Sequence, residues 1–294
     1  SINKIPECWI VSCTNPDDPS HWAYKRFFES NQLTRHVYLS KTEDNPFLPK
    51  SYIETLKESF DAKMARRMLY GEWLSIAQDI IYYSYEPDIN YVDRDYQVKK
   101  AMPVYLSFDF NIGDGKPMSC VLGQFYNGNV HWFDEVVIEG ARTLDIMEEI
   151  NARGYFNKGF NWFICGDASG SHRDTRGVRS DFDIIYKYLD NRGGNSGRIK
   201  YLRKVPRANP PVRLRHNLVN SYCKNDLGQV RLFVYNKCSV LHKGLKLTKL
   251  KKGASYIEDD SHSYQHVTTA MGYALWQMEL STKKRNIEVS SRWN

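Results

Sequence analysis

Two aspartates stand at the ends of apolar stretches that have the composition of β-strands. Asp109 closes the apolar run of YLSFDFN, and Asp167 closes that of WFICGDASG. A carboxylate in such surroundings is costly unless it is paired or bound to a cation, and ligands of open α/β sheets gather at the carboxyl ends of the strands. Two carboxylates on neighbouring strands could bridge two divalent cations, the arrangement that phosphodiester hydrolysis requires. Taken singly, either aspartate could be a helix cap or a turn former.

Oxygen ligands favour Mg²⁺ or Mn²⁺ over zinc. His262 and His266 are four residues apart, as zinc-binding histidines can be, but no Glu follows His262 as in H-E-x-x-H. The six cysteines form no C-x-x-C pair and are typical of reduced core residues. We therefore expect two Mg²⁺ or Mn²⁺ ions and no zinc.

Two further polar elements are open to more than one interpretation. Glu135, in HWFDEVVIEG, could be another carboxylate of the site or an outward-facing strand residue. The loop SGSHRDTRG carries Arg173, Asp174 and Arg176, which could contact a DNA backbone or simply be solvated.

Positive charge is concentrated in one segment of the chain. The net charge is +7, yet residues 192–252 hold 16 Lys or Arg against a single acid, Asp226, while the remainder is acidic. Such a segment suits a polyanion, because each cation near a phosphate releases condensed counterions; the alternative is a solvated basic face. The candidate DNA-binding residues are Lys200, Arg203, Lys204, Arg207, Arg213 and Arg215.

The elements that must position these residues alternate between strands and helices. Asn127-Gly128 is a strong hairpin signal between two of the strands. The patterns predict strands at 104–110, 117–126, 130–138, 162–165, 198–202 and 230–234, and helices at 143–151, 182–189, 212–222 and 263–280. This order predicts an α/β fold, a mixed sheet with helices on its faces.

The residues before this sheet form a separate unit. We expect a short strand at 7–13, a helix at 21–30, and a second helix that begins at a capping box, Ser51 to Glu54, and continues to about residue 70. The expected organisation is 1–75, a connector at 76–100, a main domain at 101–280 and a flexible tail at 281–294. The chain has no apolar run of the roughly 20 residues that a membrane span needs and no signal-peptide pattern. It also lacks an initiator Met, and we expect a fragment, or a chain whose beginning has been removed.

Ordered blocks along the chain resemble the large terminase subunits of tailed phages. Residues 11–28 and 45–73 resemble the end of that family's ATPase domain, with the TNP coupling element and the closing LYGEW. SFDFN and ICGDASG resemble its first and second nuclease motifs, and QHVTTAMGYALW resembles its C-terminal helix. The resemblance implies an RNase H-like nuclease domain preceded by a small α/β remnant of a P-loop ATPase domain.

The sequence departs from the family at one position. The last motif usually reads H-x-x-D-A-x-x-Y, and its Asp is the third metal carboxylate, but here Thr269 stands in that place. Asp259 and Asp260, just upstream, could supply the missing oxygen or merely cap the final helix. His262 or His266 could orient a ligand or a water.

The resemblance implies a metal-dependent endonuclease of a viral DNA-packaging motor, which cuts concatemeric double-stranded DNA during head filling. Asp109, Asp167 and Asp260 would be catalytic, and these three together with Asp259 would hold the metal. The implied partners are double-stranded DNA, the portal protein, the small terminase subunit and an upstream ATPase domain, with no membrane. The implied location is the host cell cytoplasm, outside the mature virion.

Other functions remain open at the level of the sequence. Because G-x-x-x-x-G-K-[ST] is absent, this chain should not hydrolyse ATP by itself. Because Thr269 breaks the carboxylate set, a DNA-binding and coupling module without cleavage is the main alternative. A resolvase or transposase of the same fold is a third, and the ATPase-like residues 1–75 argue against it.

Overall fold

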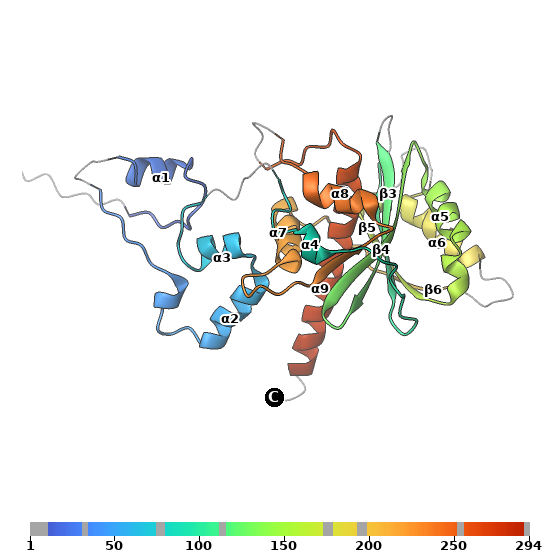
Figure 1. Cartoon of the computed structure of the whole chain (residues 1–294), viewed down its shortest axis with the longest axis horizontal. Helices are drawn as coiled ribbons and strands as arrows, with labels where there is room; N and C mark the ends of the chain where they lie inside the picture. Colours follow the sequence, from blue (N-terminus) through green and yellow to red (C-terminus); the bar gives the residue numbers. More distant parts are fainter. Residues whose placement is uncertain are drawn as a thin grey trace, which may run out of the picture.

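A mixed β-sheet forms the centre of the molecule (Figure 1). The computed structural model describes residues 11–30, 35–74, 80–111, 116–172, 179–192, 199–251 and 256–290, the last nine of them by their backbone alone. The strands within these ranges are β1 (Tyr91–Val92), β2 (Val104–Asp109), β3 (Pro117–Tyr126), β4 (Asn129–Glu139), β5 (Asn161–Gly166), β6 (Lys200–Arg203) and β7 (Leu232–Tyr235).

These strands lie in the order β1-β7-β4-β3-β2-β5-β6. The pairs β2–β3 and β3–β4 are antiparallel, and the remaining neighbours are parallel. Asn127 and Gly128 join β3 to β4 with φ angles of 51° and 78°, the left-handed values that a two-residue hairpin needs. The order from β4 to β6 is that of the predicted RNase H-like fold, and the prediction of an α/β mixed sheet is confirmed.

Helices cover both faces of the sheet (Figure 1). One face carries α5 (Thr143–Ala152) and α6 (Asp181–Asn191), and the other carries α7 (Val212–Cys223), α8 (Ser239–Leu247) and α9 (Tyr264–Ser290). Short 3-10 turns, η2 (Tyr155–Lys158) and η3 (Ala168–Ser171), flank β5.

Alternation along β2 explains why both faces are covered. Leu106 and Phe108 enter the core beneath α5 and α6, while Tyr105 enters the core beneath α7 to α9. On the latter face the hydroxyl of Ser107 donates to the carbonyl of Ala270 on α9 at 2.6 Å. Because successive side chains of a strand point to opposite faces, Asp109 shares the α9 face with Tyr105 and Ser107.

Several predicted boundaries are wrong. The helix expected from residue 51 to about 70 is two helices, α2 (Lys50–Ser59) and α3 (Ala62–Met68), because Asp61 accepts from the amides of Lys63 and Met64 and so begins a new helix. The final helix continues past residue 280 to Ser290. The helix α8 was missed altogether.

The N-terminal part projects away from the sheet (Figure 1). It holds α1 (Trp22–Phe27), η1 (Thr42–Asp44), α2 and α3. The strand predicted at 7–13 lies outside the described residues up to position 10, and residues 11–13 belong to no strand. A polar junction joins this part to α7, since Asp17 contacts both Arg67 of α3 and Arg213 of α7.

The predicted connector contributes to the sheet. It contains α4 (Pro87–Asn90) and β1, which pairs with β7. The buried amide of Asn90 donates to the carbonyls of Cys223 and Leu232 at 3.0 and 2.9 Å. This segment is therefore held to the main domain by buried hydrogen bonds.

Candidate active site

Asp109 and Asp167 stand at the same level on neighbouring parallel strands. In the ladder between β2 and β5, Phe108 pairs with Gly166, so the two aspartates occupy the next position. The amide of Asp167 donates to the carbonyl of Phe108 at 3.1 Å. Neighbouring strands are about 4.8 Å apart, and residues at one level of a sheet share a face, so both carboxylates lie at one edge on the α9 face.

The phenol of Tyr273 on α9 is influenced by the charges of both carboxylates. Burial raises the pKa of Tyr273, the charge of Arg215 lowers it, and the negative charges of Asp167 and Asp109 raise it.

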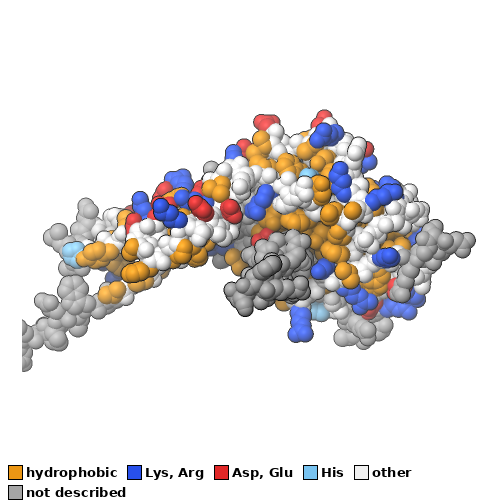
Figure 2. Space-filling view, turned by 90° about the horizontal axis from the view of Figure 1, so that it is seen from below, with side chains coloured by type: hydrophobic (Ala, Val, Ile, Leu, Met, Phe, Trp, Pro, Cys, Tyr) orange, Lys and Arg blue, Asp and Glu red, His pale blue; other side chains and the backbone are white. Residues whose placement is uncertain are grey.

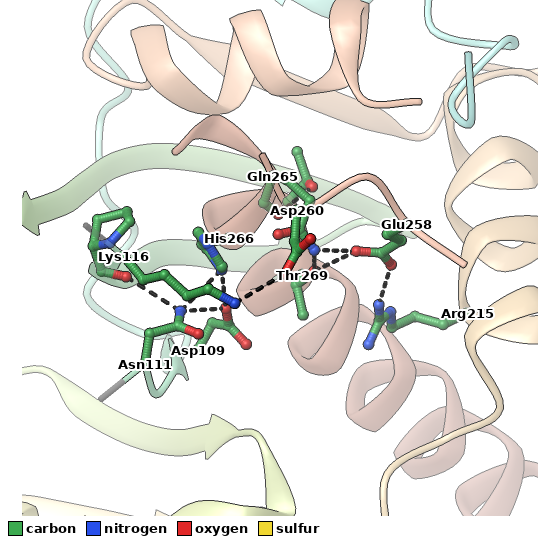
Figure 3. Close-up of polar contacts among 11 residues, drawn as sticks. Asp109, Asn111, Lys116, Arg215, Glu258, Asp260, Gln265, His266 and Thr269 are labelled. Carbon is green, nitrogen blue, oxygen red and sulfur yellow. Dashed lines mark hydrogen bonds and ion pairs between the residues drawn. The ribbon is translucent and has the colours of Figure 1, made fainter. Parts of the chain in front are cut away.

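Asp109 at the end of β2 is buried, and its carboxylate contacts a residue of α9. Its side-chain Oδ2 accepts from Asn111 Nδ2 at 2.9 Å and lies 3.0 Å from His266 Nδ1 (Figure 3). Asn111 Nδ2 also donates to the carbonyl of Pro117 at 3.2 Å. Asn111 Nδ2 also lies 2.9 Å from His266 Nδ1. Because its two hydrogens can serve Asp109 and Pro117, the tautomer of His266 that carries a proton on Nδ1 can donate to the carboxylate.

Asp167 ends β5 at a sharp turn. Its Oδ1 accepts from the amide of Ser169 and from Asn209 Nδ2, both at 2.7 Å. Gly166, just before it, has a φ of 149°, and a Cβ there would lie 2.6 Å from the carbonyl oxygen of Phe108. Only glycine lets the end of β5 approach β2 this closely.

A buried hydroxyl beside Asp109 lacks a hydrogen-bond partner among the described residues. Ser119 pairs with Asp109 across β2 and β3, is fully buried, and its Oγ has no protein partner. An unsatisfied buried hydroxyl costs about 1–3 kcal/mol. Together with two carboxylates, it gives this edge of the sheet the oxygen donors that a hard divalent cation takes.

Thr269, one turn of α9 beyond His266, contacts a carboxylate that sequence reasoning missed. Its hydroxyl lies 3.1 Å from Glu258 Oε2 (Figure 3). Arg215 Nη2 and His216 Nε2 each contact Glu258 Oε1 at 2.5 Å, and Gln265 donates to Oε2. Burial alone would raise the pKa of Glu258, but the bond from His216 and the charge of Arg215 hold it well below its usual range.

Comparisons with known proteins agree with this architecture. Residues 3–72 match the sequence profile of the family described as phage terminase large subunit. The predicted resemblance to phage large terminase subunits is confirmed. No curated protein matches the sequence.

The solved large terminase of a thermophilic bacteriophage shares the fold. The large terminase of a thermophilic bacteriophage, in complex with ATP-γ-S, matches with a TM-score of 0.61 at 17% identity, over 89% of this chain and 61% of that one. Another crystal form of the same phage protein matches with a TM-score of 0.62 at the same identity, over 89% and 59%. The P22 large terminase nuclease domain matches with a TM-score of 0.49 at 12% identity, over 69% and 93%. The chain thus spans about three fifths of the thermophilic phage terminase.

The acids expected to complete the terminase metal site have other partners here. Asp260 Oδ2 pairs with Lys116 Nζ at 2.9 Å, and both side chains are about half exposed. Asp259 accepts from the amide of Ser261. Among the residues that the structure describes, no group of three or more His, Cys, Asp or Glu side chains is placed to hold one metal ion. The ligand roles predicted for Asp259 and Asp260 stay predictions.

Glu135 is neither an outward-facing residue nor part of the acid pair. It is buried on β4, and its carboxylate accepts from the amides of Val240 and Leu241 at 2.6 and 2.8 Å. These amides belong to the first turn of α8, whose unpaired N–H groups favour an anion. His262 is exposed and stacks on Tyr264.

The basic residues of this terminase-like chain do not form one stripe. Arg203 packs over Tyr186 of α6 at 3.9 Å, whereas Lys204 lies 5.2 Å from the ring of Phe163, on the face of the acid pair. Arg215, predicted to contact a phosphate, is 3% exposed and pairs with Glu258, so its guanidinium is turned away from solvent here. Lys200, Arg207 and Arg213 are exposed, and Arg173, Asp174 and Arg176 lie outside the described residues.

Figure 2 shows Lys and Arg side chains gathered over the sheet-containing part, while acidic and basic side chains are interspersed on the N-terminal arm. None of the described helices is both long and apolar enough to cross a membrane.

Proposed function

We propose that this chain is the nuclease part of a phage DNA-packaging motor, a metal-dependent endonuclease that cuts concatemeric double-stranded DNA. The observation that carries the proposal is the placement of Asp109 and Asp167 at one level of adjacent parallel strands, on one face. The likeness to large terminases supports the fold and the packaging context.

The donors present fit Mg²⁺ or Mn²⁺, and we propose two ions. Asp109 and Asp167 would hold them, since carboxylate oxygens suit these hard cations. When bound, such ions activate water and stabilise the leaving oxygen of the phosphodiester. His266 fixes the orientation of the Asp109 carboxylate, and Asn209 and the Ser169 amide fix that of Asp167.

Cations on the same face would hold the DNA backbone. The half-buried Lys204 is the best placed of them, and contacts of this kind position a duplex without reading its sequence. We further propose an upstream ATPase domain, the portal protein and the small terminase subunit as partners, and the host cell cytoplasm as the location. This chain alone should not hydrolyse ATP, since it lacks the P-loop sequence.

A plasmid assay tests the proposal. Supercoiled plasmid is incubated with the chain and Mn²⁺, beside Asp109→Ala, Asp167→Ala and the exposed control Asp95→Asn. We expect nicking that requires metal, disappears in both site variants and persists in the control. Nicking that survives Asp109→Ala would contradict the assignment.

The same assay separates the second candidate function, a DNA-binding module without cleavage. Thr269 favours it, because a hydroxyl replaces a carboxylate on α9. Intact plasmid together with retained, salt-sensitive DNA binding in a gel-shift assay would support the module over the nuclease.

A further inference from the structure

Arg215 carries a buried positive charge beside the acid pair. Its guanidinium lies 4.7 Å from the ring centre of Tyr273, which follows His266, the residue in contact with Asp109, by about two turns of α9. Gly272 makes this approach possible, since a Cβ there would lie 2.8 Å from Arg215 Cδ. An uncompensated cation in this place would compete with a divalent ion for the two aspartates.

Glu258 is the anion that compensates Arg215. Both side chains are at least nine-tenths buried, and the two form a direct ion pair at 2.5 Å. Burial lowers the pKa of His216, so the third member of the cluster adds no positive charge near neutral pH. The Nε of Arg215 has no partner among the described residues, which leaves the pair with Glu258 as the principal restraint on the guanidinium.

We propose that Glu258 is a positioning residue of the nuclease site: it neutralises Arg215 and holds it against Tyr273, which leaves the charges of Asp109 and Asp167 available to a divalent cation. The inference rests on the proposed function, in which the acid pair binds that cation. In this proposal the acid that serves the α9 side of the site is Glu258, which lies in the segment before the helix.

Calorimetric titration with Mn²⁺ in the absence of DNA tests the charge argument. Glu258→Gln keeps the shape of the side chain and removes its charge, and we expect Mn²⁺ affinity to fall at least tenfold. Adding Arg215→Met should restore the affinity to within about threefold of the wild type, because both buried charges are then gone. A folded Glu258→Gln protein with unchanged affinity would overturn the inference, as would a double variant that binds no better than the single one.

Stability is measured in parallel, because removing one partner of a buried ion pair is strongly destabilising, whereas removing both is often tolerated. If Glu258→Gln alone does not fold, Mn²⁺ affinity is compared in the folded double variant and in Arg215→Met. Arg215→Met should bind Mn²⁺ at least as tightly as the wild type, and a tenfold loss would refute the proposal.

Asp109→Ala distinguishes the two levels of the argument. If it binds Mn²⁺ like the wild type, the proposed function itself fails. If it loses binding while Glu258→Gln keeps it, only the role of Glu258 fails.

Discussion

His266 Nδ1 on α9 lies 3.0 Å from Asp109 Oδ2 at the end of β2. This contact ties the C-terminal helix to one of the two acids, although 157 residues separate them in the chain. Contacts that orient a metal-binding side chain typically contribute 10- to 100-fold to metal affinity or activity.

His266→Ala should therefore lower Mn²⁺-dependent plasmid nicking by about 10- to 100-fold, since the Asp109 carboxylate loses its partner on α9. The exposed His262→Ala is the matched control and should nick like the wild type. Initial rates across Mn²⁺ concentrations, with thermal unfolding of each variant, provide the measurement. Equal rates for both variants would show that this contact has no bearing on catalysis.

Gly166→Ala should separate the ends of β2 and β5. Its φ of 149° and the 2.6 Å approach of a Cβ to the Phe108 carbonyl both oppose a side chain, and we expect a loss of about 2–3 kcal/mol in the free energy of unfolding. Gly159→Ala is the comparison, because φ is also positive there but no atom lies within 4 Å of the added Cβ. It should cost only about 1 kcal/mol. Urea unfolding of the two variants measures the loss in the free energy of unfolding, and equal losses would contradict the steric argument.

Lys204 and Arg203 should contribute differently to DNA binding. Lys204 lies on the face of the acid pair, and Arg203 lies on the face of α6. Each lost phosphate contact reduces the slope of log affinity against log salt by about one. We expect that reduction for Lys204→Gln and none for Arg203→Gln, measured by fluorescence anisotropy with a duplex. A reversed result would place the DNA on the opposite face.

Glu135 should make stability fall as pH rises. Burial raises its pKa to about 7 from a usual value of 4.5, so the folded protein retains a proton that the unfolded chain releases. The stabilisation is fully present below about pH 4.5 and is lost as pH rises through 7, an upper limit of about 3 kcal/mol. Glu135→Gln cannot titrate and should flatten this dependence. Chemical unfolding between pH 4.5 and 8 measures it, and parallel curves for the two proteins would exclude the assignment.

The sequence indicated the sheet and the acid pair because both depend on local patterns. Apolar runs mark β2 and β5, and each run ends in an aspartate, so the strand ends and the carboxylates were predicted together. Glu258 was not recognised and Arg215 was assigned to DNA, because their ion pair joins positions 43 apart in sequence. The sequence likewise did not show on which face of the sheet Lys204 lies, since this depends on the residue at which β6 ends.

The split between α2 and α3 had a local signal that was overlooked. Asp61 is an N-cap residue within an otherwise helical pattern, and such side chains compete with the helix for backbone amides. The same reasoning did not reveal α8, whose first turn is held by Glu135 from a distant strand.

His266, Thr269 and Tyr273 follow one another at intervals of three and four residues along α9, so one stripe of the helix meets the acid pair, Glu258 and Arg215. Each residue of an α-helix advances the azimuth by about 100°, and a single-residue insertion between them would swing part of the stripe away from the sheet. Among natural variants of this protein, insertions and deletions should therefore be rare between positions 266 and 273.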